Sequence, residues 1–333
     1  MKVAINGFGR IGRQILHIIK QKETDLEVVA INDLTSNDML SHLFEFDSTY
    51  GRYPGTVELK GDEMIVDGQT IKLYTEADPT KLPWGDLDVD VIFECTGVFR
   101  THEKASLHVQ GGAKRVIVSA PCKGDTPADA TIVMGVNEKL LKAEDKIVSN
   151  ASCTTNCLAP IAKVLNDSFG IKRGLMTTIH AVTATQKVLD APDKDMRRAR
   201  SCLQNMIPTT TGAAIAVGLV LPEINGKLNG MAVRVPTPTV SLVDLVVELE
   251  KEVTVEDVNN AFETRAKEIP HILKLERRPL VSKDFQQDSH SSSVDAANTM
   301  VMDKTLVKVL SWYDNEWGYS ARMVDLAEYM GNL

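Results

Sequence analysis

The chain has 333 residues, 43% of them hydrophobic and 25% charged, and this ordinary globular composition excludes a disordered or collagen-like chain. The length favours about two domains, because single hydrophobic cores stop growing near about 250 to 300 residues. A formal net charge of -8 gives no basic field for nucleic acid, so we expect no nucleic acid as a primary partner.

Cysteine content and the N-terminus indicate the compartment. The five cysteines are an odd number at irregular spacing, which argues against a disulfide framework. No window approaches the run of about 18 apolar residues that spans a membrane. The opening MKVAINGFGR lacks the charged start, apolar run and cleavage site of a secretory signal. We therefore expect a cytoplasmic protein without a membrane partner.

Short apolar runs alternate with helical stretches in the first half of the chain. Runs rich in Val and Ile, continuous rather than alternating, are typical of strands buried on both faces of a parallel sheet. They occur at residues 2–6, 27–33, 89–97, 114–121 and 131–137. This half is predicted to form a doubly wound α/β domain.

A glycine-rich turn follows the first of these strands and opens a helix. Gly7 permits a tight turn, Gly9 lets the backbone approach a pyrophosphate, and Gly12 allows close packing of helix on strand. Asp33 ends the second strand, where a carboxylate accepts hydrogen bonds from an adenosine ribose and repels a 2′-phosphate. Glycines also end strands for purely structural reasons, but this context favours a Rossmann-type domain that binds NAD.

The pattern changes near residue 150. One helix and a long polar stretch over 181–211 precede a run of longer strands over 230–250, whose alternating segments predict a mostly antiparallel sheet with one covered face. We expect an α+β catalytic domain over 151–315. The dinucleotide-binding domain is expected to comprise residues 1–150 and the C-terminal helix, residues 316–333.

The stretch SNASCTTNCLAP, residues 149–160, places two cysteines four positions apart. Ser149 or Asn150 can cap a helix that begins here, so Cys153 lies in or before its first turn, where free N–H groups lower a thiol pKa. A zinc pair lacks further ligands, and a disulfide within one helix constrains little, so no metal site is expected. Cys157, one turn further on, is predicted to be a small buried hydrophobe.

Cys153 needs a base to act as a nucleophile. His180 closes the predicted strand GLMTTIH, and a histidine at a strand end can project into a cleft, although alone it would more often be structural. His17, His102 and His108 lie in helical, mostly charged surroundings, where we expect them to be solvated.

Together these segments resemble a known family. SNASCTTNCLAP, TTIH, RRAR, TTTGAA, NGMAVRVPTPTVSLVDL and WYDNEWGYS are similar, in order and over the whole chain, to segments of the phosphorylating glyceraldehyde-3-phosphate dehydrogenases of the bacterial type I. The resemblance implies oxidation of D-glyceraldehyde 3-phosphate with NAD, through a hemithioacetal and a thioester on Cys153, with inorganic phosphate as acceptor and 1,3-bisphosphoglycerate as product. It implies a homotetramer and a place in glycolysis or gluconeogenesis.

The resemblance also assigns residues. It makes His180 the partner of Cys153 and adds Arg10, Ile11, Ser119 and Asn315 to the cofactor site. The substrate and attacking phosphates are assigned to Ser152, Thr154, Thr183, Arg198, Thr211, Gly212 and Arg234. Spacing does not decide which of Arg197, Arg198 and Arg200 faces a phosphate.

Four positions depart from the family's pattern. Ala77 replaces an arginine that many members have near the adenine. Ala191-Pro192 is halfway between the Leu-Pro of NAD users and the Ala-Ser of NADP-accepting members, so we expect NAD preference with some NADP tolerance. Val182 and Ile215 replace a tyrosine and a lysine, and nothing explains either change in functional terms.

Two rival functions remain at this point. An erythrose-4-phosphate dehydrogenase would use similar Cys and His residues but water as acceptor, and the retained TTTGAA segment favours phosphate instead. A non-catalytic moonlighting protein with a dead site is the other rival, and the intact Cys153 and His180 make it a poor primary role.

Overall fold

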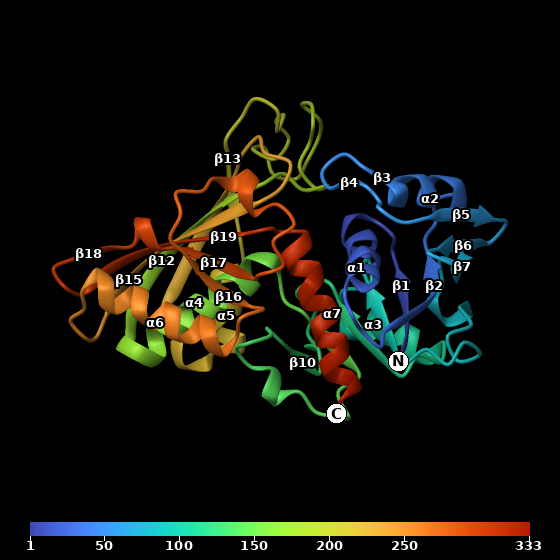
Figure 1. Ribbon diagram of the computed structural model, residues 1–333, viewed down its shortest axis with the longest axis horizontal. Coiled ribbons are helices and arrows are strands. Elements are labelled where there is room, and N and C mark those ends of the chain that lie inside the picture. The colour runs from blue at the N-terminus through green and yellow to red at the C-terminus, as the bar shows by residue number, and fades with distance from the viewer. The chain divides into compact units, whose positions relative to one another are not determined.

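The computed structural model describes all 333 residues, and the chain forms two compact units (Figure 1). Unit 1 comprises Met1–Ile132, Glu138–Ala151 and Ser320–Leu333, and unit 2 comprises Val133–Asn137 and Ser152–Tyr319. The predicted division placed residues 133–137 in the N-terminal domain, whereas in the structure they belong to unit 2. The assignment of one unit to the cofactor and the other to catalysis stays a prediction.

Unit 1 is built on a nine-stranded sheet with the order β10-β11-β9-β8-β1-β2-β7-β6-β5. The strands from β10 to β7 are parallel, and β6 runs antiparallel to β5 and β7. The strands are β1 (Lys2–Asn6), β2 (Glu27–Asn32), β5 (Val57–Lys60), β6 (Glu63–Val66), β7 (Gln69–Tyr74), β8 (Val91–Glu94), β9 (Arg115–Val118), β10 (Ala130–Thr131) and β11 (Ile147–Ser149). The predicted doubly wound α/β fold is confirmed.

The strand order reverses at β1, because the chain continues to β2 on one side and later returns to β8 on the other. In register, Asn6 at the end of β1 lies beside Asn32 of β2 and Glu94 of β8. Ligands of open α/β sheets bind outside the carboxyl ends of the strands at such a switch point. The glycine-rich turn leaves β1 at this place.

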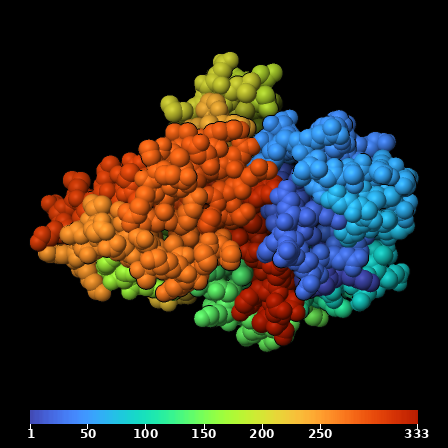
Figure 2. Space-filling view, in the orientation of Figure 1, coloured from blue at the N-terminus to red at the C-terminus, as the bar shows by residue number.

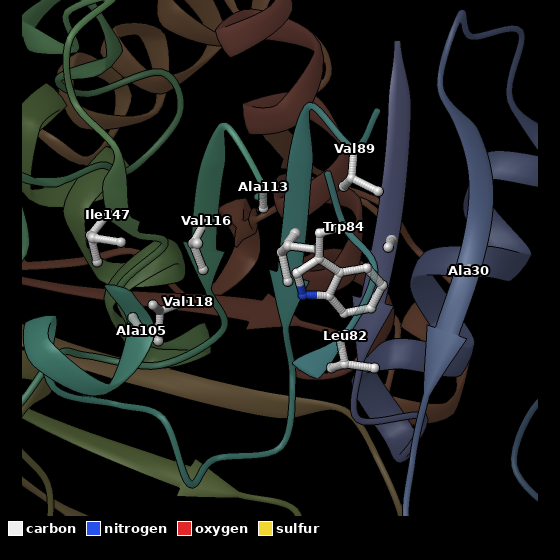
Figure 3. Close-up of a cluster of buried hydrophobic side chains, with 11 residues drawn as sticks. Ala30, Leu82, Trp84, Val89, Ala105, Ala113, Val116, Val118 and Ile147 are labelled. Atoms are coloured by element: carbon white, nitrogen blue, oxygen red, sulfur yellow. The ribbon is translucent and has the colours of Figure 1, made fainter. Parts of the chain in front are cut away.

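The helices of unit 1 are α1 (Arg10–Gln21), α2 (Asn37–Glu45) and α3 (His102–Gln110), and the C-terminal helix α7 (Trp317–Gly331) returns to this unit. Lys22, at the end of α1, pairs with Asp325 at 2.8 Å and with Glu328 at 2.5 Å on α7. One core cluster contains strand residues, Ala105 of α3, which lies beside Val118, and Trp84, which is fully buried (Figure 3).

Unit 2 is built on a mixed, mostly antiparallel sheet with the order β13-β14-β12-β15-β19-β17-β16, in which β18 also pairs with β19. Only the β12–β14 and β16–β17 pairs are parallel. The strands are β12 (Ile171–His180), β13 (Ile207–Thr210), β14 (Leu228–Arg234), β15 (Ser241–Leu249), β16 (Leu273–Glu276), β17 (Ser292–Asp295), β18 (Met300–Met302) and β19 (Leu306–Tyr313). The predicted antiparallel character is confirmed.

Helices α4 (Cys153–Phe169), α5 (Ala213–Val220) and α6 (Val255–Glu268) pack on one face of this sheet (Figure 1). Alternate residues of β15 are buried beneath them, as the period of two requires. The opposite face carries half-buried and exposed side chains, among them Leu175 of β12, which is 69% exposed. One face is therefore covered by helices and the other is open in the single chain.

The remaining elements are short. Strands β3 (Phe46–Asp47) and β4 (Gly51–Arg52) form a hairpin, and the 3-10 helices are η1 (Pro79–Lys81), η2 (Glu138–Leu140), η3 (Pro222–Ile224), η4 (Ser282–Phe285) and η5 (Ala296–Asn298). Between β12 and β13 the chain has turns and bends without helix or strand, and Figure 2 shows this yellow-green segment standing out from the sheet of its own unit. No helix is both long enough and apolar enough to cross a membrane.

One predicted strand was wrong, and one predicted run of strands is interrupted. Residues 131–137 form mostly turn, with only Ala130–Thr131 paired as β10, because the chain leaves unit 1 there. The run over 230–250 divides into β14 and β15, separated by the segment that contains Pro236 and Pro238. Proline lacks the N–H group that a ladder needs, which explains the break.

Candidate active site

The glycine-rich turn in unit 1 requires glycine at two positions for packing. Gly7 has a φ of +91°, and a Cβ on it would lie 2.6 Å from the backbone nitrogen of Thr96. A Cβ on Gly12 would lie 2.2 Å from the carbonyl oxygen of Gly7. Gly9 differs, because it is exposed and a Cβ there would meet no atom within 4 Å. The turn thus presents open backbone at Gly9 between two tightly packed glycines.

This turn has the features that a dinucleotide phosphate needs. Gly9 is the N-cap of α1 and supplies no side-chain hydrogen bond, so the N–H groups of the first turn are left without a side-chain cap. The Asp33 carboxylate, at the end of β2, accepts from the N–H of Phe8 at 2.8 Å and from the N–H of Thr35 at 2.9 Å. Its half-exposed position leaves room to accept from a ribose hydroxyl. The residues present fit NAD.

The other predicted cofactor residues of unit 1 lie near the strand ends or in the first turn of α1. Arg10 pairs with Asp47 and lies 5.5 Å from the ring centroid of Tyr50, and Ile11 follows it half-buried. Ser119, directly after β9, donates its N–H to the Glu94 carbonyl at 3.0 Å. The structure therefore brings them to the carboxyl end of the sheet, with the glycine-rich turn.

Asn315 lies in unit 2, two residues after the end of β19, and is buried. Its Oδ1 accepts from the Ser241 hydroxyl at 2.8 Å, and the oxygen of that hydroxyl accepts from the N–H of Ala181 at 3.0 Å. Ser241 therefore fixes the side-chain amide and leaves its NH₂ group to donate elsewhere. The sequence interpretation missed Ser241, although it lies inside the segment NGMAVRVPTPTVSLVDL.

Cys153 is the first residue of α4, and its cap differs from the prediction. The Ser152 side chain accepts from the N–H of Thr155 at 3.1 Å and is therefore the N-cap. The predicted caps, Ser149 and Asn150, were wrong, because β11 runs through Ser149 and the chain turns only afterwards. Cys153 thus stands at the helix N-terminus, as predicted.

The structure brings His180 and Arg234 to Cys153. His180 ends β12, and its Nε2 lies 3.5 Å from the Cys153 Sγ. Arg234 ends the neighbouring parallel strand β14 in register with His180. Arg234 Nη1 contacts His180 Nδ1 and donates to the Ala181 carbonyl at 2.9 Å, while Nδ1 lies 2.7 Å from the same oxygen. Two adjacent parallel strands thus set the base and the arginine side by side.

Burial dominates the pKa values at this centre. It raises the pKa of the Cys153 thiol, against the opposing effects of the Arg234 charge and the Thr154 N–H. The predicted lowering by the helix N-terminus is present but is outweighed. Burial and the Arg234 charge lower the pKa of His180 to about 3. Without substrate, the pair is therefore a thiol beside a neutral imidazole at neutral pH.

The three arginines of the run RRAR differ in exposure and in ion-pair partners. Arg200 forms an exposed ion pair, Arg197 is exposed, and Arg198 Nε lies 3.4 Å from the Asp195 carboxylate. Burial lowers the pKa of Arg234, and the Arg198 charge adds to this. Of the three, Arg198 is the one whose charge reaches the Cys153 centre.

Thr211 and Gly212 stand at the start of α5. Gly212 is its N-cap, is exposed and offers no side-chain cap, and Thr211 Oγ1 accepts from the N–H of Ala213 at 3.2 Å. The nearby Thr209 donates to Asp195 at 3.3 Å, which ties the TTTGAA segment to the loop that carries Arg198. Thr183 does not share these bonds. Its hydroxyl oxygen instead lies 3.0 Å from the hydroxyl oxygen of Thr185.

Thr154 does not expose its hydroxyl. Its Oγ1 lies 2.9 Å from the hydroxyl of Tyr313, which in turn lies 2.8 Å from Thr178 Oγ1. The Tyr313 ring meets the His180 ring edge-on, with 5.9 Å between centroids. Tyr313 was also missed, and its place in the segment WYDNEWGYS, two residues before Asn315, was the available signal.

The other cysteines and histidines complete the comparison with the sequence. Cys157 is fully buried as predicted, and all five cysteines are free. His102 lies on the surface of α3 in an ion pair, but His17 and His108 are buried, so their predicted solvation was wrong.

Comparison with known proteins gives matches over the whole chain. Residues 1–102 match the family model described as glyceraldehyde 3-phosphate dehydrogenase, NAD binding domain, and residues 152–315 match that of its C-terminal domain. A glyceraldehyde-3-phosphate dehydrogenase of Priestia megaterium is 55% identical over 99% of this chain and 98% of its own length. Those of Geobacillus stearothermophilus and Bacillus subtilis are each 54% identical, over 100% and 99% of this chain and 98% of their own lengths. Residues 1–102, within unit 1, thus belong to an NAD-binding domain, and the chain belongs to the glyceraldehyde 3-phosphate dehydrogenase family.

Proposed function

We propose that this chain oxidises D-glyceraldehyde 3-phosphate and phosphorylates the product to 1,3-bisphosphoglycerate, with Cys153 as nucleophile and His180 as base. The 3.5 Å separation of Sγ and Nε2 is the observation that carries the proposal. It is within reach of proton transfer in a ligand-free site, where catalytic hydrogen bonds are commonly long. Family membership and the named relatives support the dehydrogenase activity.

The tautomer of His180 decides whether it acts as a base. When Nδ1 carries the proton it donates to the Ala181 carbonyl at 2.7 Å, and the Nε2 lone pair then faces the thiol. An arginine is only a donor, so its contact with Nδ1 favours the opposite tautomer. A substrate phosphate that draws Arg234 away would therefore leave Nε2 free to accept the Cys153 proton.

The reaction then follows from the residues in place. The Cys153 thiolate attacks the aldehyde carbon while protonated His180 returns its Nε2 proton to the carbonyl oxygen, which gives the hemithioacetal hydroxyl. Nε2 then takes that proton back as hydride leaves the carbon and the carbonyl reforms as a thioester. NAD held at the glycine-rich turn and Asp33 would supply the acceptor for the hydride that leaves that carbon. A phosphate oxygen attacks the resulting thioester, the Cys153 thiolate leaves, and an acyl phosphate is released.

Two phosphates need positive charge or donors close to the thioester. Arg198 and Arg234 supply charge, and the start of α5 supplies N–H groups that Gly212 does not cap, apart from the N–H of Ala213, which donates to Thr211 Oγ1. Ser152, Thr154, Thr183 and Thr211 supply the remaining predicted contacts. Because Thr154 bonds Tyr313 in the ligand-free chain, its hydroxyl must turn, or its N–H must serve instead.

Self-association and compartment complete the proposal. The open face of the unit 2 sheet places Leu175 beside Val246 in register, and Met231, 40% exposed, lies on the same face. Met196 and Met206 on the projecting loop are 89% and 75% exposed. Apolar area of this kind is covered in an assembly, which supports the homotetramer. A cytoplasmic location agrees with five free cysteines.

The test is the initial rate of NAD reduction by the purified protein with glyceraldehyde 3-phosphate, with and without inorganic phosphate. We expect sustained turnover only with phosphate. Equal turnover without phosphate would make water the acceptor and would remove the phosphate roles of Thr211, Gly212 and Arg234. The same assay with NADP tests the tolerance proposed from Ala191-Pro192, which is contradicted if NADP supports no turnover.

A further inference from the structure

A fully buried carboxylate lies directly beneath the glycine-rich turn. Glu94 ends β8, and its side chain and that of His108 on α3 are 0% exposed. The carboxylate accepts from four groups. Oε1 accepts from the N–H of Thr96 at 2.9 Å and from its hydroxyl, and Oε2 accepts from Asn6 Nδ2 at 2.6 Å and His108 Nε2 at 3.0 Å. None of these donors is a lysine or an arginine.

The protonation of His108 follows from its second partner. Trp84 Nε1 donates to His108 Nδ1 at 3.1 Å, and an indole N–H is only a donor. Nδ1 must therefore hold a lone pair, so a neutral His108 carries its proton on Nε2 and directs it to Glu94. This arrangement fixes Glu94 as an acceptor from every side, that is, as a carboxylate stabilised by neutral donors.

The same bonds reach the cofactor turn. Asn6 directly precedes Gly7, and its Oδ1 accepts from Asn32 Nδ2 at 2.7 Å. Asn32 directly precedes Asp33, and its carbonyl accepts from the N–H of Gly7 at 2.8 Å.

On the other side of the turn, the backbone nitrogen of Thr96 is the atom that a Cβ on Gly7 would strike. The Glu94 carboxylate thus holds both neighbours of the turn, Thr96 through Oε1 and Asn6 through Oε2.

We propose that Glu94 is a positioning residue for the dinucleotide, which sets the glycine-rich turn and Asp33 through Thr96, Asn6 and Asn32. The inference rests on the NAD binding given by the family match and not on the thioester chemistry. Glu94 does not touch the cofactor in this scheme. It acts by fixing the ends of β1, β2 and β8, to which the binding groups are attached.

The substitution Glu94→Gln tests the positioning role, because no rearrangement of the neighbouring side chains gives all hydrogen-bonding groups of the new amide a partner. Whichever way the amide turns, its NH₂ faces two former donors. His108 cannot become an acceptor at Nε2 while Trp84 donates to Nδ1, and Asn6 can turn only by losing its bond to Asn32. We expect the dissociation constant of NAD, measured by calorimetric titration of the full chain, to rise about tenfold or more, since a buried charge-assisted bond is lost.

Asp90→Asn is the matched control. Asp90 precedes β8 and accepts from the N–H of Lys2 at 2.9 Å and from Lys114 Nζ at 2.7 Å, so it ties the opposite ends of β1 and β8. Its loss should lower the melting temperature of the NAD-free protein without changing NAD affinity.

An E94Q protein that is folded by circular dichroism and binds NAD as tightly as wild type would overturn the proposal. Equal weakening by D90N would also overturn it, because it would indicate general loosening of the sheet. If E94Q does not fold, Thr96→Val keeps the shape and the N–H but removes the hydroxyl, which donates to Glu94 and also accepts from the N–H of Val98 at 3.0 Å. We expect T96V to weaken NAD binding several-fold, and unchanged affinity would refute the role. Because the readout is NAD binding, it is independent of whether Cys153 reacts as proposed.

Discussion

The charge of Arg234 lowers the pKa of both Cys153 and His180. It therefore favours the charged form of the cysteine and the neutral form of the histidine. Toward Cys153 it favours the thiolate, and toward His180 it opposes the imidazolium that would accompany that thiolate. Because burial raises the thiol pKa and lowers the imidazole pKa, the ion pair is disfavoured until something changes the surroundings. Substrate phosphate, which would recruit Arg234, is the group best placed to make that change.

Replacing Arg234 should move the reactivity of Cys153. In Arg234→Gln the thiol pKa rises further, because an attractive charge is lost. The pH profile of iodoacetamide alkylation of the NAD-free protein should therefore move to higher pH, and the rate at a fixed pH should fall about tenfold for every pH unit that the profile moves. Arg200→Gln, which removes only an exposed ion pair, is the control and should leave the profile unchanged. An unchanged profile in R234Q would contradict the effect of this charge.

His180 should make the protein less stable in acid. Its pKa is about 3 in the folded chain and about 6.5 in the unfolded chain, so below pH 6.5 the unfolded chain binds a proton that the folded chain does not. This destabilisation grows as pH falls from about 6.5 toward 3 and is absent above that window.

In His180→Gln, the slope of unfolding free energy against pH should be smaller by up to about 1.4 kcal/mol per pH unit. Urea denaturation of both proteins between pH 5 and 8 measures it. Parallel slopes for the two proteins would show that folding does not lower the pKa of His180.

At the scale of elements, α4 and α6 both begin with a side-chain N-cap, but only the cap of α4 directly precedes a proposed catalytic residue. Ser152 caps α4 and Thr254 caps α6, each through a bond from an N–H in the first turn. Ser152→Ala and Thr254→Ala should each lower the free energy of unfolding by about 1 kcal/mol. Only S152A should also lower kcat/KM, by about tenfold or more, because the cap positions Cys153, the next residue, and because the Ser152 hydroxyl is also proposed to contact a phosphate.

Urea denaturation and steady-state kinetics of the two variants separate these effects. An equal loss of kcat/KM in both variants would show that the cap of α4 does not position the nucleophile.

The start of α4 shows how far sequence determines an element. Its existence, and the place of Cys153 at its N-terminus, were predictable because capping residues precede an apolar run. The cap itself was not, since Ser149, Asn150 and Ser152 are all good caps, and the choice depends on where β11 ends. The prediction of a strand over 131–137 was wrong for a similar reason. An apolar run does not reveal that the chain passes from one unit to the other there.

Among site residues, local pattern found those attached to a motif and missed those defined by distant partners. The glycines, Asp33 and Cys153 stand in patterns with a direct physical reading. His108 did not, because charged neighbours in the helix suggested solvent, whereas Trp84 and Glu94 bury it from elsewhere in the chain. The phosphate set came only from family resemblance, since a threonine in a turn or an arginine on a strand has no distinctive local pattern.

At the scale of the whole molecule, the proposed homotetramer predicts that the open sheet face of unit 2 packs against a second copy of the chain. Leu175 is 69% exposed near the middle of β12, with β14 and β15 on its two sides. In Leu175→Glu, packing a second copy against this face would bury the new carboxylate, which is costly. We therefore expect smaller assemblies, measured by light scattering after size-exclusion chromatography. Leu140→Glu is the matched control, because Leu140 is 65% exposed on η2 in unit 1.

The two leucine variants give separate outcomes. Dissociation in L175E alone, with the circular dichroism of a folded chain, would assign the sheet face to the assembly. A wild-type mass for L175E would contradict that assignment and move the interface to the projecting loop, where Met206→Glu is the next variant. Dissociation in L140E as well would mean that added charge, not the lost apolar surface, separates the copies.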